Sequence, residues 1–343
     1  MMTQTEFLED LERRLGVLPA GERRRAVDFY RELIQDGMES GKSEEEAVDA
    51  LGSPETAAAA LLEEQPVQSK LQALDEKNRE LACGGVTEIL VDVRDQPVVL
   101  EPSPDDWLHV YYREDSGDNY HYSTEGGRVC LIHRHILGPM SLIRGFYHLI
   151  QARRILIQLP SVYAGRLEVR TTNNSIRADG FPFLNEAIFH SSNGSITLSL
   201  IGCARMEAST SNAAIILSNI KADSAVVISS NASLTLDAVK AENALEVRTS
   251  NGQIQLTEVA AQAMTATTSN GKIQFTRLAA PAIRLKSSNG ALRGSIVGNP
   301  HTYSVTGRTS NARCTLPCWE DPAMPNRLEA ITSNGAIDIS FCE

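Results

Sequence analysis

The stretch LEVRTSNGQIQL at residues 245–256 carries the pattern that decides the fold, because the second half of the chain repeats it. Its centre is a pair of Ser/Thr residues followed by Asn and usually Gly. The Asn of this phrase occurs nine times, at spacings of 19 to 23 residues. The nine residues are Asn173, Asn193, Asn212, Asn231, Asn251, Asn270, Asn289, Asn311 and Asn334. A period of about 20 residues is typical of stacked repeats, in which each unit buries its apolar face against its neighbours.

Apolar or small residues flank each Asn at fixed offsets. In the repeat at 245–256 these residues are Leu245 and Val247 before the Asn and Ile254 and Leu256 after it. Alternation with a period of two indicates extended strands with one buried face. The phase of the alternation changes across the Asn, which places a corner there. Each repeat is therefore predicted to contain a strand, a Ser/Thr-Asn-Gly corner, a second strand and a looser return.

Two architectures accommodate this pattern. One is a β-solenoid of stacked coils, and the other is an antiparallel meander with Asn-Gly in type I′ hairpin turns. We favour the solenoid, because one corner recurs at one period and like residues occupy like positions. The expected fold class is α+β, with a small N-terminal helical bundle followed by an all-β solenoid (β-helix) of about nine coils of ~20 residues. Asn and Gly at the corner are expected to accommodate positive φ.

The Asn column has two interpretations. Stacked Asn side chains form amide ladders in β-structures, and a neighbouring hydroxyl satisfies backbone groups at a corner. The other interpretation is a calcium or sugar site. Calcium requires several carboxylate oxygens, and these corners carry none. We therefore expect a structural corner without a metal or a cofactor.

Charge is concentrated at the N-terminus. The formal net charge of the chain is −11, and residues 1–65 contain 16 acidic and 7 basic residues. The repeats are nearly neutral, so they lack the basic face that nucleic-acid binding requires. Low aromatic content (5%) also argues against a stacking platform for carbohydrate or single strands. We expect no nucleic-acid partner.

The cysteine pattern and the N-terminus favour a cytoplasmic protein. The sequence starts with an acidic, polar stretch instead of a signal peptide, and no apolar run reaches the roughly 18 residues of a membrane span. Six cysteines are scattered along the chain, two of them on expected strands, which is typical of reduced structural cysteines. They are Cys83, Cys130, Cys203, Cys314, Cys318 and Cys342.

Residues 1–65 are expected to form about four helices. Thr3 with Glu6 and Ser43 with Glu46 have capping-box spacing, and Ser53 precedes Pro54 at a first helical position. The segment resembles the HAAS-type domain of bacterial signalling-associated membrane proteins. The features that match are Phe7-Leu8, Leu18-Pro19, Phe29-Tyr30, Gly41 with the Glu44–Glu46 run, and Leu51-Gly52-Ser53-Pro54.

The repeats over residues 86–343 resemble the bacterial putative-adhesin family of β-strand repeats, a domain of unknown function. Proteins that combine these two domains often carry transmembrane helices between them, and this sequence shows none there. The resemblance implies a signalling or regulatory context and supplies no catalytic residues.

A linker and a cap are expected between the helical domain and the coils. Residues 66–85 are expected to form a linker helix, because Leu71, Leu74 and Leu81 have helical spacing. Residues 86–160 are expected to form an N-terminal cap sheet that covers the first coil, with the coils over 161–343. The cap contains a basic insertion at 133–154, without an acidic residue.

The basic insertion is a candidate interaction segment through Arg134, Arg144, Arg153 and Arg154. Three interpretations remain open for it: packing on the end of the solenoid, docking on the acidic helical domain, or contact with a membrane surface. Cys130, His133 and His135 have the spacing of zinc ligands, but the sequence offers no evident fourth ligand.

An enzyme remains the rival class, because some β-solenoids act on polysaccharides. Glu168, Glu207 and Glu246 share one column but fall in alternate coils, about 10 Å apart. Phosphate-binding glycine loops, paired-histidine zinc motifs and nucleophile elbows are absent from the sequence.

The main prediction is a non-enzymatic interaction or scaffold protein. The helical domain would bind a regulatory or signalling protein, and the solenoid would be a scaffold or a second binding surface. A self-assembling rod is an alternative, because the last coil would expose an unpaired edge for a second copy unless the Pro-rich stretch 316–325 covers it. A surface adhesin is a further alternative.

Overall fold

The computed structural model describes residues 3–16, 43–49, 51–63, 75–114, 118–135 and 154–343, together with isolated positions between 23 and 38. The chain divides into two compact units. One is helical and lies within residues 1–75, and the other is built from residues 76–135 and 153–343. Each unit has its own apolar core.

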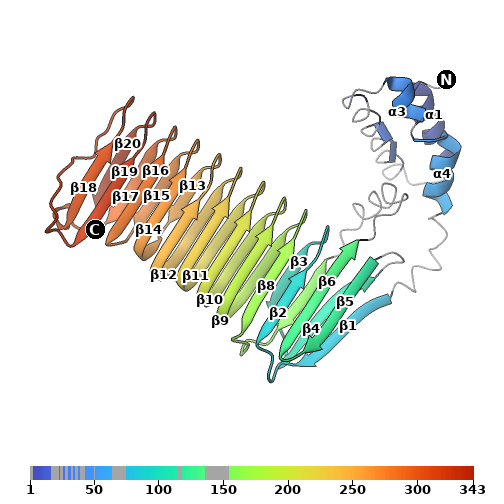
Figure 1. Ribbon diagram of the computed structural model, residues 1–343, viewed down its shortest axis with the longest axis horizontal. Helices are drawn as coiled ribbons and strands as arrows, with labels where there is room; N and C mark the ends of the chain where they lie inside the picture. The colour runs from blue at the N-terminus through green and yellow to red at the C-terminus, as the bar shows by residue number, and fades with distance from the viewer. Residues whose placement is uncertain are drawn as a thin grey trace. The chain divides into compact units, whose positions relative to one another are not determined.

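The helical unit contains α1 (Gln4–Arg14), α3 (Glu44–Asp49) and α4 (Pro54–Glu63) (Figure 1). Both predicted capping boxes are present: Thr3 exchanges hydrogen bonds with Glu6, and Ser43 exchanges them with Glu46. The described positions between 23 and 38 belong to another of the four expected helices and are helical as well. Its Tyr30 ring lies 5.7 Å from the ring of Phe7, between ring centroids. The apolar faces of these short helices thus meet in one small core.

The β unit contains a 20-stranded arrangement. Up to the first corner, at Asn173, the strands are β1 (Asp75–Ala82), β2 (Glu88–Asp92), β3 (Val98–Pro102), β4 (Trp107–Glu114), β5 (Asp118–Glu125), β6 (Arg128–His135), β7 (Ile155–Leu159) and β8 (Arg166–Thr171). After that corner come β9 (Ile176–Ser191), β10 (Ile196–Thr210), β11 (Ile215–Ser229), β12 (Leu234–Arg248), β13 (Ile254–Thr257), β14 (Ala260–Thr268), β15 (Ile273–Leu278), β16 (Ala282–Ser287), β17 (Leu292–Val297), β18 (Tyr303–Arg308), β19 (Asn326–Ile331) and β20 (Ile337–Cys342). A short 3-10 helix spans Pro300–Thr302.

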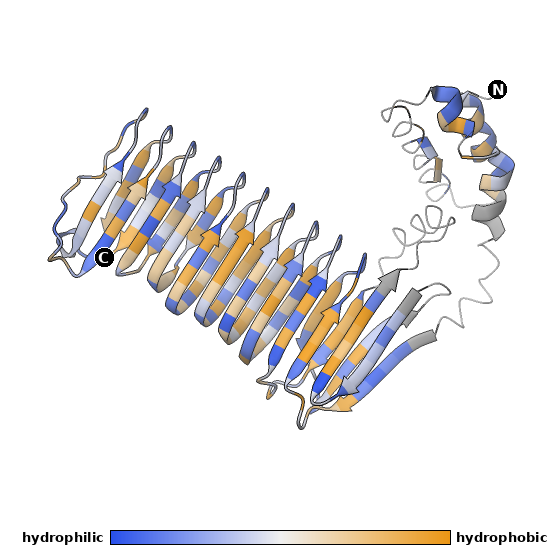
Figure 2. Cartoon of the chain, in the orientation of Figure 1, coloured by the Kyte–Doolittle hydropathy of each residue, from blue (hydrophilic) through white to orange (hydrophobic). Residues whose placement is uncertain are grey.

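The coils stack in parallel register, which confirms the solenoid over the meander (Figure 1). Ile196 on β10 pairs with Ile176 of the coil before it and with Ile215 of the coil after it. The column three residues after each Asn therefore runs as a continuous apolar stack, and its members Ile176, Ile196, Ile215, Leu234, Ile254, Ile273, Leu292 and Ile337 are each 0% exposed. Figure 2 shows the matching alternation of apolar and polar bands along the strands. Burial of each such side chain contributes about 2 kcal/mol.

The first coil in the sequence is not the first coil in space. Strand β2 lies between β6 and β8, and β3 lies between β7 and β9, all in parallel register. The prediction of a cap sheet over residues 86–160 is therefore wrong for residues 88–102, which form a coil inside the stack. The reason is that Ile89, Val91, Val98 and Leu100 hold the same offsets around Asp95 that the apolar columns hold around each Asn.

Strands β4 and β5 form the actual cap, because they pair antiparallel with β7 and β6. Strand β1 pairs with β4 and extends this cap. The linker helix predicted over 66–85 is thus wrong for residues 75–82, and Leu71 and Leu74 lie outside the described residues. Residues 75–82 form a strand because the edge of β4 provides backbone hydrogen-bond partners for them. The charged sequence of β1 suits a strand at the edge of a sheet.

At the C-terminal end, too, the order of the coils in space differs from their order in the sequence. Strand β19 lies between β16 and β18, so the last coil in the sequence is inserted beneath β18. Residues 316–321 then run along the outer edge of β18, where Val305 and Trp319 exchange backbone hydrogen bonds of 2.7 and 3.1 Å. The expectation of an uncovered last coil is therefore wrong for β19, whereas β20 pairs with β17 and meets Cys314 at one isolated bridge. The Pro-rich segment covers the edge of β18, in agreement with the second expectation for that stretch.

A second corner lies seven residues after six of the nine Asn residues and has no fixed residue type. Its backbone is left-handed, with φ between 52° and 84°, in six successive coils. The residues are Gly180, Leu200, Asn219, Ala238, Glu258 and Arg277. This conformation costs a non-glycine residue roughly 1–2 kcal/mol, so most coils carry strain at this position.

Leu200→Gly is expected to stabilise the protein by about 0.5 kcal/mol, because relief of the left-handed strain exceeds the entropy cost of glycine. The Leu200 side chain is 56% exposed, so little burial is lost. Urea unfolding of the full chain measures the change. Thr197→Gly, three residues earlier on the same strand β10, is the control and should destabilise. Equal losses for both variants would contradict the strain argument.

Candidate functional site

The nine predicted corner asparagines lie in one column and form a hydrogen-bonded ladder. Each amide Nδ2 donates to the Oδ1 of the residue in the preceding layer, for example Asn251 to Asn231 at 2.8 Å and Asn270 to Asn251 at 2.7 Å. The ladder follows spatial order, so Asn334 donates to Asn289, and Asn311 donates to Asn334. The remaining rungs join Asn193, Asn212, Asn231 and Asn289 to their neighbours.

Asp95 ends the ladder at the N-terminal side by accepting from Asn173. A carboxylate suits this place, because the terminal rung has to accept a hydrogen bond from the amide of the next layer. The sequence search missed this rung because Arg94-Asp95-Gln96 replaces the Ser/Thr-Asn-Gly phrase. The amides from Asn173 onward satisfy one another, so the column is a structural ladder instead of a set of free ligands.

The corner asparagines do not adopt positive φ, contrary to expectation. Glycine follows many of them for a different reason, which is the close approach of successive coils. A Cβ atom on Gly271 would lie 1.8 Å from the carbonyl oxygen of Gly252, and one on Gly290 would lie 1.7 Å from that of Gly271. Where glycine occupies this corner, the backbone of the preceding coil therefore leaves no room for a Cβ atom.

The first Ser/Thr of the phrase forms a second, buried ladder. The hydroxyl of Thr268 accepts the N–H of Gly271 at 3.1 Å and donates to the carbonyl of Gly252 in the preceding layer at 3.1 Å. Ser287 and Thr332 repeat the arrangement one and two layers further. Thr268 is 2% exposed, so its hydroxyl satisfies backbone groups that water does not reach.

Thr268→Val is expected to destabilise the protein by about 2 kcal/mol, because an isosteric methyl leaves a buried N–H and a buried carbonyl without partners. Thermal and urea unfolding followed by circular dichroism measure the loss. Thr268→Ser keeps the hydroxyl and is expected to cost less than half as much. If Thr268→Ser loses as much stability as Thr268→Val, the contribution of Thr268 comes from packing of its methyl group and not from the hydroxyl ladder.

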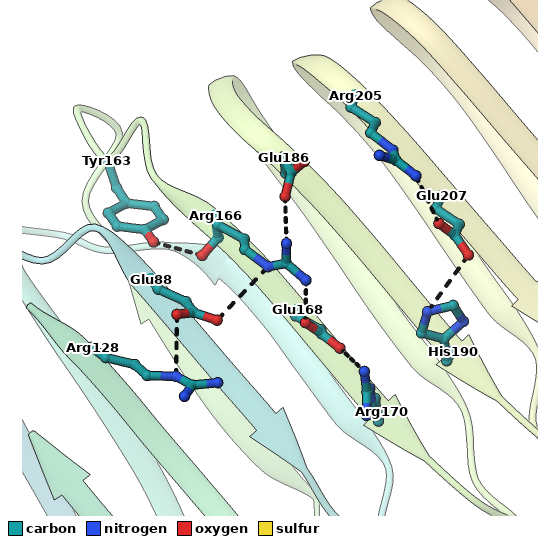
Figure 3. A network of polar contacts seen from close by, with 10 residues as sticks. All are labelled: Glu88, Arg128, Tyr163, Arg166, Glu168, Arg170, Glu186, His190, Arg205 and Glu207. Atoms are coloured by element: carbon teal, nitrogen blue, oxygen red, sulfur yellow. Dashed lines mark hydrogen bonds and ion pairs between the residues drawn. The ribbon is translucent and has the colours of Figure 1, made fainter.

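Charged side chains gather on the outward face of the first layers (Figure 3). We call this group the charged face, and its members are Glu88, Arg128, Arg166, Glu168, Arg170, Glu186, His190, Arg205 and Glu207. Arg166 joins three carboxylates: Glu168 at 2.7 Å, Glu186 at 2.6 Å and Glu88 at 3.7 Å. Glu88 also contacts Arg128 at 3.1 Å. The network links β6, β2, β8 and β9, which are the strands that meet where the coil order is exchanged.

Glu168 is the buried centre of the charged face, with a side chain 5% exposed. Burial by itself would raise the pKa of Glu168, but the hydrogen bond from Arg166 and the charges of Arg170 and Arg166 together lower it below its ordinary value. The hydrogen bond to Glu168 raises the pKa of Arg166 in turn. The carboxylate is therefore held ionised, which suits an ion-pair anchor and not a general acid.

His190 lies between a hydroxyl and a carboxylate, an arrangement that the sequence analysis missed. Its Nδ1 bonds the hydroxyl of Ser209, and its Nε2 lies 3.8 Å from Glu207. These are the residue types of a nucleophile, a base and an orienting acid. An acyl-transfer site also needs free N–H donors for the oxyanion. The backbone around Ser209 belongs to the parallel ladders of β9, β10 and β11, so its N–H groups are engaged.

The glutamate column lies as predicted. Ile188 separates Glu168 from Glu207, and Val226 separates Glu207 from Glu246 in the paired register. Each carboxylate has a basic partner within its own layer instead of a second carboxylate. Paired acids of the kind that glycoside hydrolysis uses are therefore not brought together in this column.

The basic insertion is only partly described. Arg134 lies on β6 with its backbone opposite Asn119, and Arg154 is exposed just before β7. Arg144 and Arg153 lie outside the described residues. The structure therefore does not bring the four predicted arginines into one described surface.

The zinc spacing does not assemble a site in the described part of the chain. Cys130 and His133 are an odd number of residues apart on β6, so their side chains leave opposite sides of the strand. His133 instead stacks on Tyr120, with ring centroids 4.5 Å apart. Among the described residues, no group of three His, Cys, Asp or Glu side chains is placed to hold a metal ion.

No described helix is both long and apolar enough to cross a membrane.

Comparison with solved structures gives only distant likeness. A "putative adhesin" from Bacteroides fragilis aligns over 78% of this chain and 97% of its own, with 12% identity and a TM-score of 0.36. A "putative cell adhesion protein" from Clostridium sporogenes aligns over 78% of this chain and 100% of its own, with 12% identity and a TM-score of 0.18. A search of curated proteins finds no match. Likeness at this level transfers no function.

Family profiles give a firmer result. The HAAS profile matches residues 6–60, which include α3 and most of α1 and α4. The profile described as Toastrack DUF4097 matches residues 86–339, more than half of the chain and nearly the whole solenoid. Both matches agree with the domains that the sequence features indicate. The chain therefore belongs to the Toastrack DUF4097 family and carries an N-terminal HAAS domain.

Proposed function

We propose that this chain is a cytoplasmic, non-enzymatic interaction protein whose helical unit binds a regulatory or signalling protein and whose solenoid is the scaffold. The observation that carries the proposal is the state of the solenoid's polar groups. The Asn amides bond to one another, the buried hydroxyls bond to backbone groups, and the carboxylates of the charged face pair with arginines. A surface that satisfies itself in this way suits presentation of a partner more than turnover of a substrate.

The helical unit provides the chemistry for recognition. Its folded core is small, and acidic side chains such as Glu9 and Glu45 are exposed on its helices. Residues 1–65 contain 16 acidic and 7 basic residues. The negative electrostatic field of this acidic excess favours a partner with a basic surface and accelerates the association of the two proteins. All six cysteines are free thiols, which supports the proposed reducing compartment.

Affinity capture from native lysate tests the proposal. The baits are the full chain and the double variant Glu9→Lys/Glu45→Lys, in which both replaced side chains are exposed. The matched control is Asp223→Lys/Glu242→Lys, an equal change of charge at exposed solenoid positions. We expect a protein retained by the full chain and the control and lost with the helical double variant.

Two results would contradict the proposal. An identical set of captured proteins from all three baits would remove the helical unit from partner binding. Recovery of the protein in the periplasmic or surface fraction of its cells would remove the cytoplasmic assignment and favour the adhesin alternative.

A further inference from the structure

Two cysteines meet at the C-terminal cap, a name we use for residues 316–321 on the outer edge of β18. The sulfurs of Cys314 and Cys318 lie 3.7 and 3.6 Å from the same carbonyl oxygen, that of Leu316. They also lie 3.1 and 3.2 Å from the position that a Cβ atom on Gly307 would occupy. Because the two sulfurs lie 3.1 and 3.2 Å from the same point, they are at most about 6 Å apart.

Gly307 gives the two sulfurs their space. The equivalent position of the other Asn repeats holds Val, Phe, Ala or Leu side chains, and this coil alone among them has glycine. The N–H of Gly307 donates to the sulfur of Cys318 at 3.1 Å. Leu316, 4% exposed, fixes the short loop between the cysteines in the core. The loop and the strand thus hold both thiols on one side of Gly307.

We propose that Cys314 and Cys318 form a redox-active dithiol that closes to a disulfide and fastens the C-terminal cap onto β18. Rotation of both side chains toward the space over Gly307 would bring the sulfurs to bonding distance. Cys318 is the exposed member and meets the oxidant first, and Cys314 is the half-buried member that completes the bond.

The chemistry balances with a low-molecular-weight disulfide such as oxidised glutathione. The Cys318 thiolate attacks it, a mixed disulfide forms and one glutathione thiol leaves. The Cys314 thiolate then attacks the sulfur of Cys318, and the second glutathione thiol leaves. The protein loses two protons and two electrons, and the glutathione disulfide gains them.

The disulfide would restrict the contacts that begin at Trp319, the residue after Cys318. Trp319 donates its indole N–H to the carbonyl of Tyr303, and its backbone pairs with Val305. Glu320 continues the cap by accepting from Thr306 at 3.2 Å and Arg308 at 3.0 Å. A closed loop of five residues just before these contacts would restrict opening of the cap. Oxidation would thereby protect the edge of β18 from pairing with another chain.

Titration of the full chain with reduced and oxidised glutathione, followed by alkylation and trypsin, tests the bond directly. Cleavage after Arg313 and Arg327 releases one peptide that contains Cys314 and Cys318 and no other cysteine. We expect this peptide to resist alkylation and to be lighter by two hydrogens under oxidising conditions. Cys203, whose pKa burial raises to about 12, is an internal comparison and should stay alkylatable after unfolding. Pairing of Cys314 or Cys318 with other cysteines, or full alkylation of both, overturns the proposal.

Hydrogen exchange tests the fastening. Exchange at the amides of Val305 and Trp319 is expected to slow by about tenfold on oxidation of the full chain. Cys314→Ser and Cys318→Ser should each abolish this redox dependence, whereas Cys342→Ser should keep it. A disulfide that forms without slowing these two amides would overturn the role in the cap. Redox dependence that survives in Cys314→Ser would overturn the pairing.

Discussion

Replacement of Gly271 by alanine is expected to destabilise the solenoid by about 3 kcal/mol, more than any exposed substitution on its faces. The added Cβ would lie 1.8 Å from the carbonyl oxygen of Gly252, 2.5 Å from its carbonyl carbon and 2.9 Å from the nitrogen of Gln253. All three atoms belong to the backbone of the preceding coil, so no side-chain rotation relieves the overlap. The coils must separate, and separation breaks the ladders that cross this corner.

Urea unfolding of the full chain measures this loss. Lys272→Ala is the control, because Lys272 is the next residue and its side chain is exposed; its expected cost is below about 0.5 kcal/mol. Ala213 and Ala232 occupy the equivalent position in two adjacent coils, so a corner backbone that accepts alanine exists in this fold. A loss below about 1 kcal/mol for Gly271→Ala would mean that the corner at Gly271 switches to that backbone, and the stacking argument would fail.

Much of the solenoid was predictable, because its columns are periodic in the sequence. Ile196, Ile215 and Leu234 stack as the offset from Asn requires, and the Asn ladder follows from the same period. The exchanged coil order was not predictable from the repeat. A coil has the same apolar pattern whichever coils lie beside it. The residues around Asp95 and Asn334 therefore do not indicate that these coils are stacked out of sequence order.

The second corner and the strand β1 escaped prediction for a different reason. Leu200, Ala238 and Arg277 share a left-handed backbone without sharing a side-chain chemistry, so the sequence carries no common signal. Strand β1 forms because the cap offers it an edge, which is a property of the assembled sheet. The charged face was visible only as separate residues, because Glu88 and Arg166 are far apart in sequence and meet through the exchanged order.

Glu168→Gln is expected to destabilise the protein by about 2 kcal/mol at pH 7, because the neutral amide leaves Arg166 and Arg170 without their buried counter-charge. The side chain of Glu168 is 5% exposed and keeps nearly the same shape in the variant. Glu246→Gln is the matched control. Glu246 occupies the same column, is 42% exposed and has one partner, Arg248 at 3.2 Å, so its loss should be below about 1 kcal/mol.

The dependence on pH distinguishes the lost charge from lost packing. The pKa of Glu168 is lower in the folded protein than in the unfolded chain, even though burial opposes this, because Arg166 donates to the carboxylate and Arg170 adds its charge. Its contribution is therefore complete above the unfolded pKa, about 4.3, and is lost as the pH falls through the lower folded pKa. The stabilities of the parent and Glu168→Gln should converge as the pH is lowered below that value. A difference that stays constant between pH 7 and the acid limit of folding would assign the loss to packing, and the charged face would no longer explain how the exchanged coils hold together.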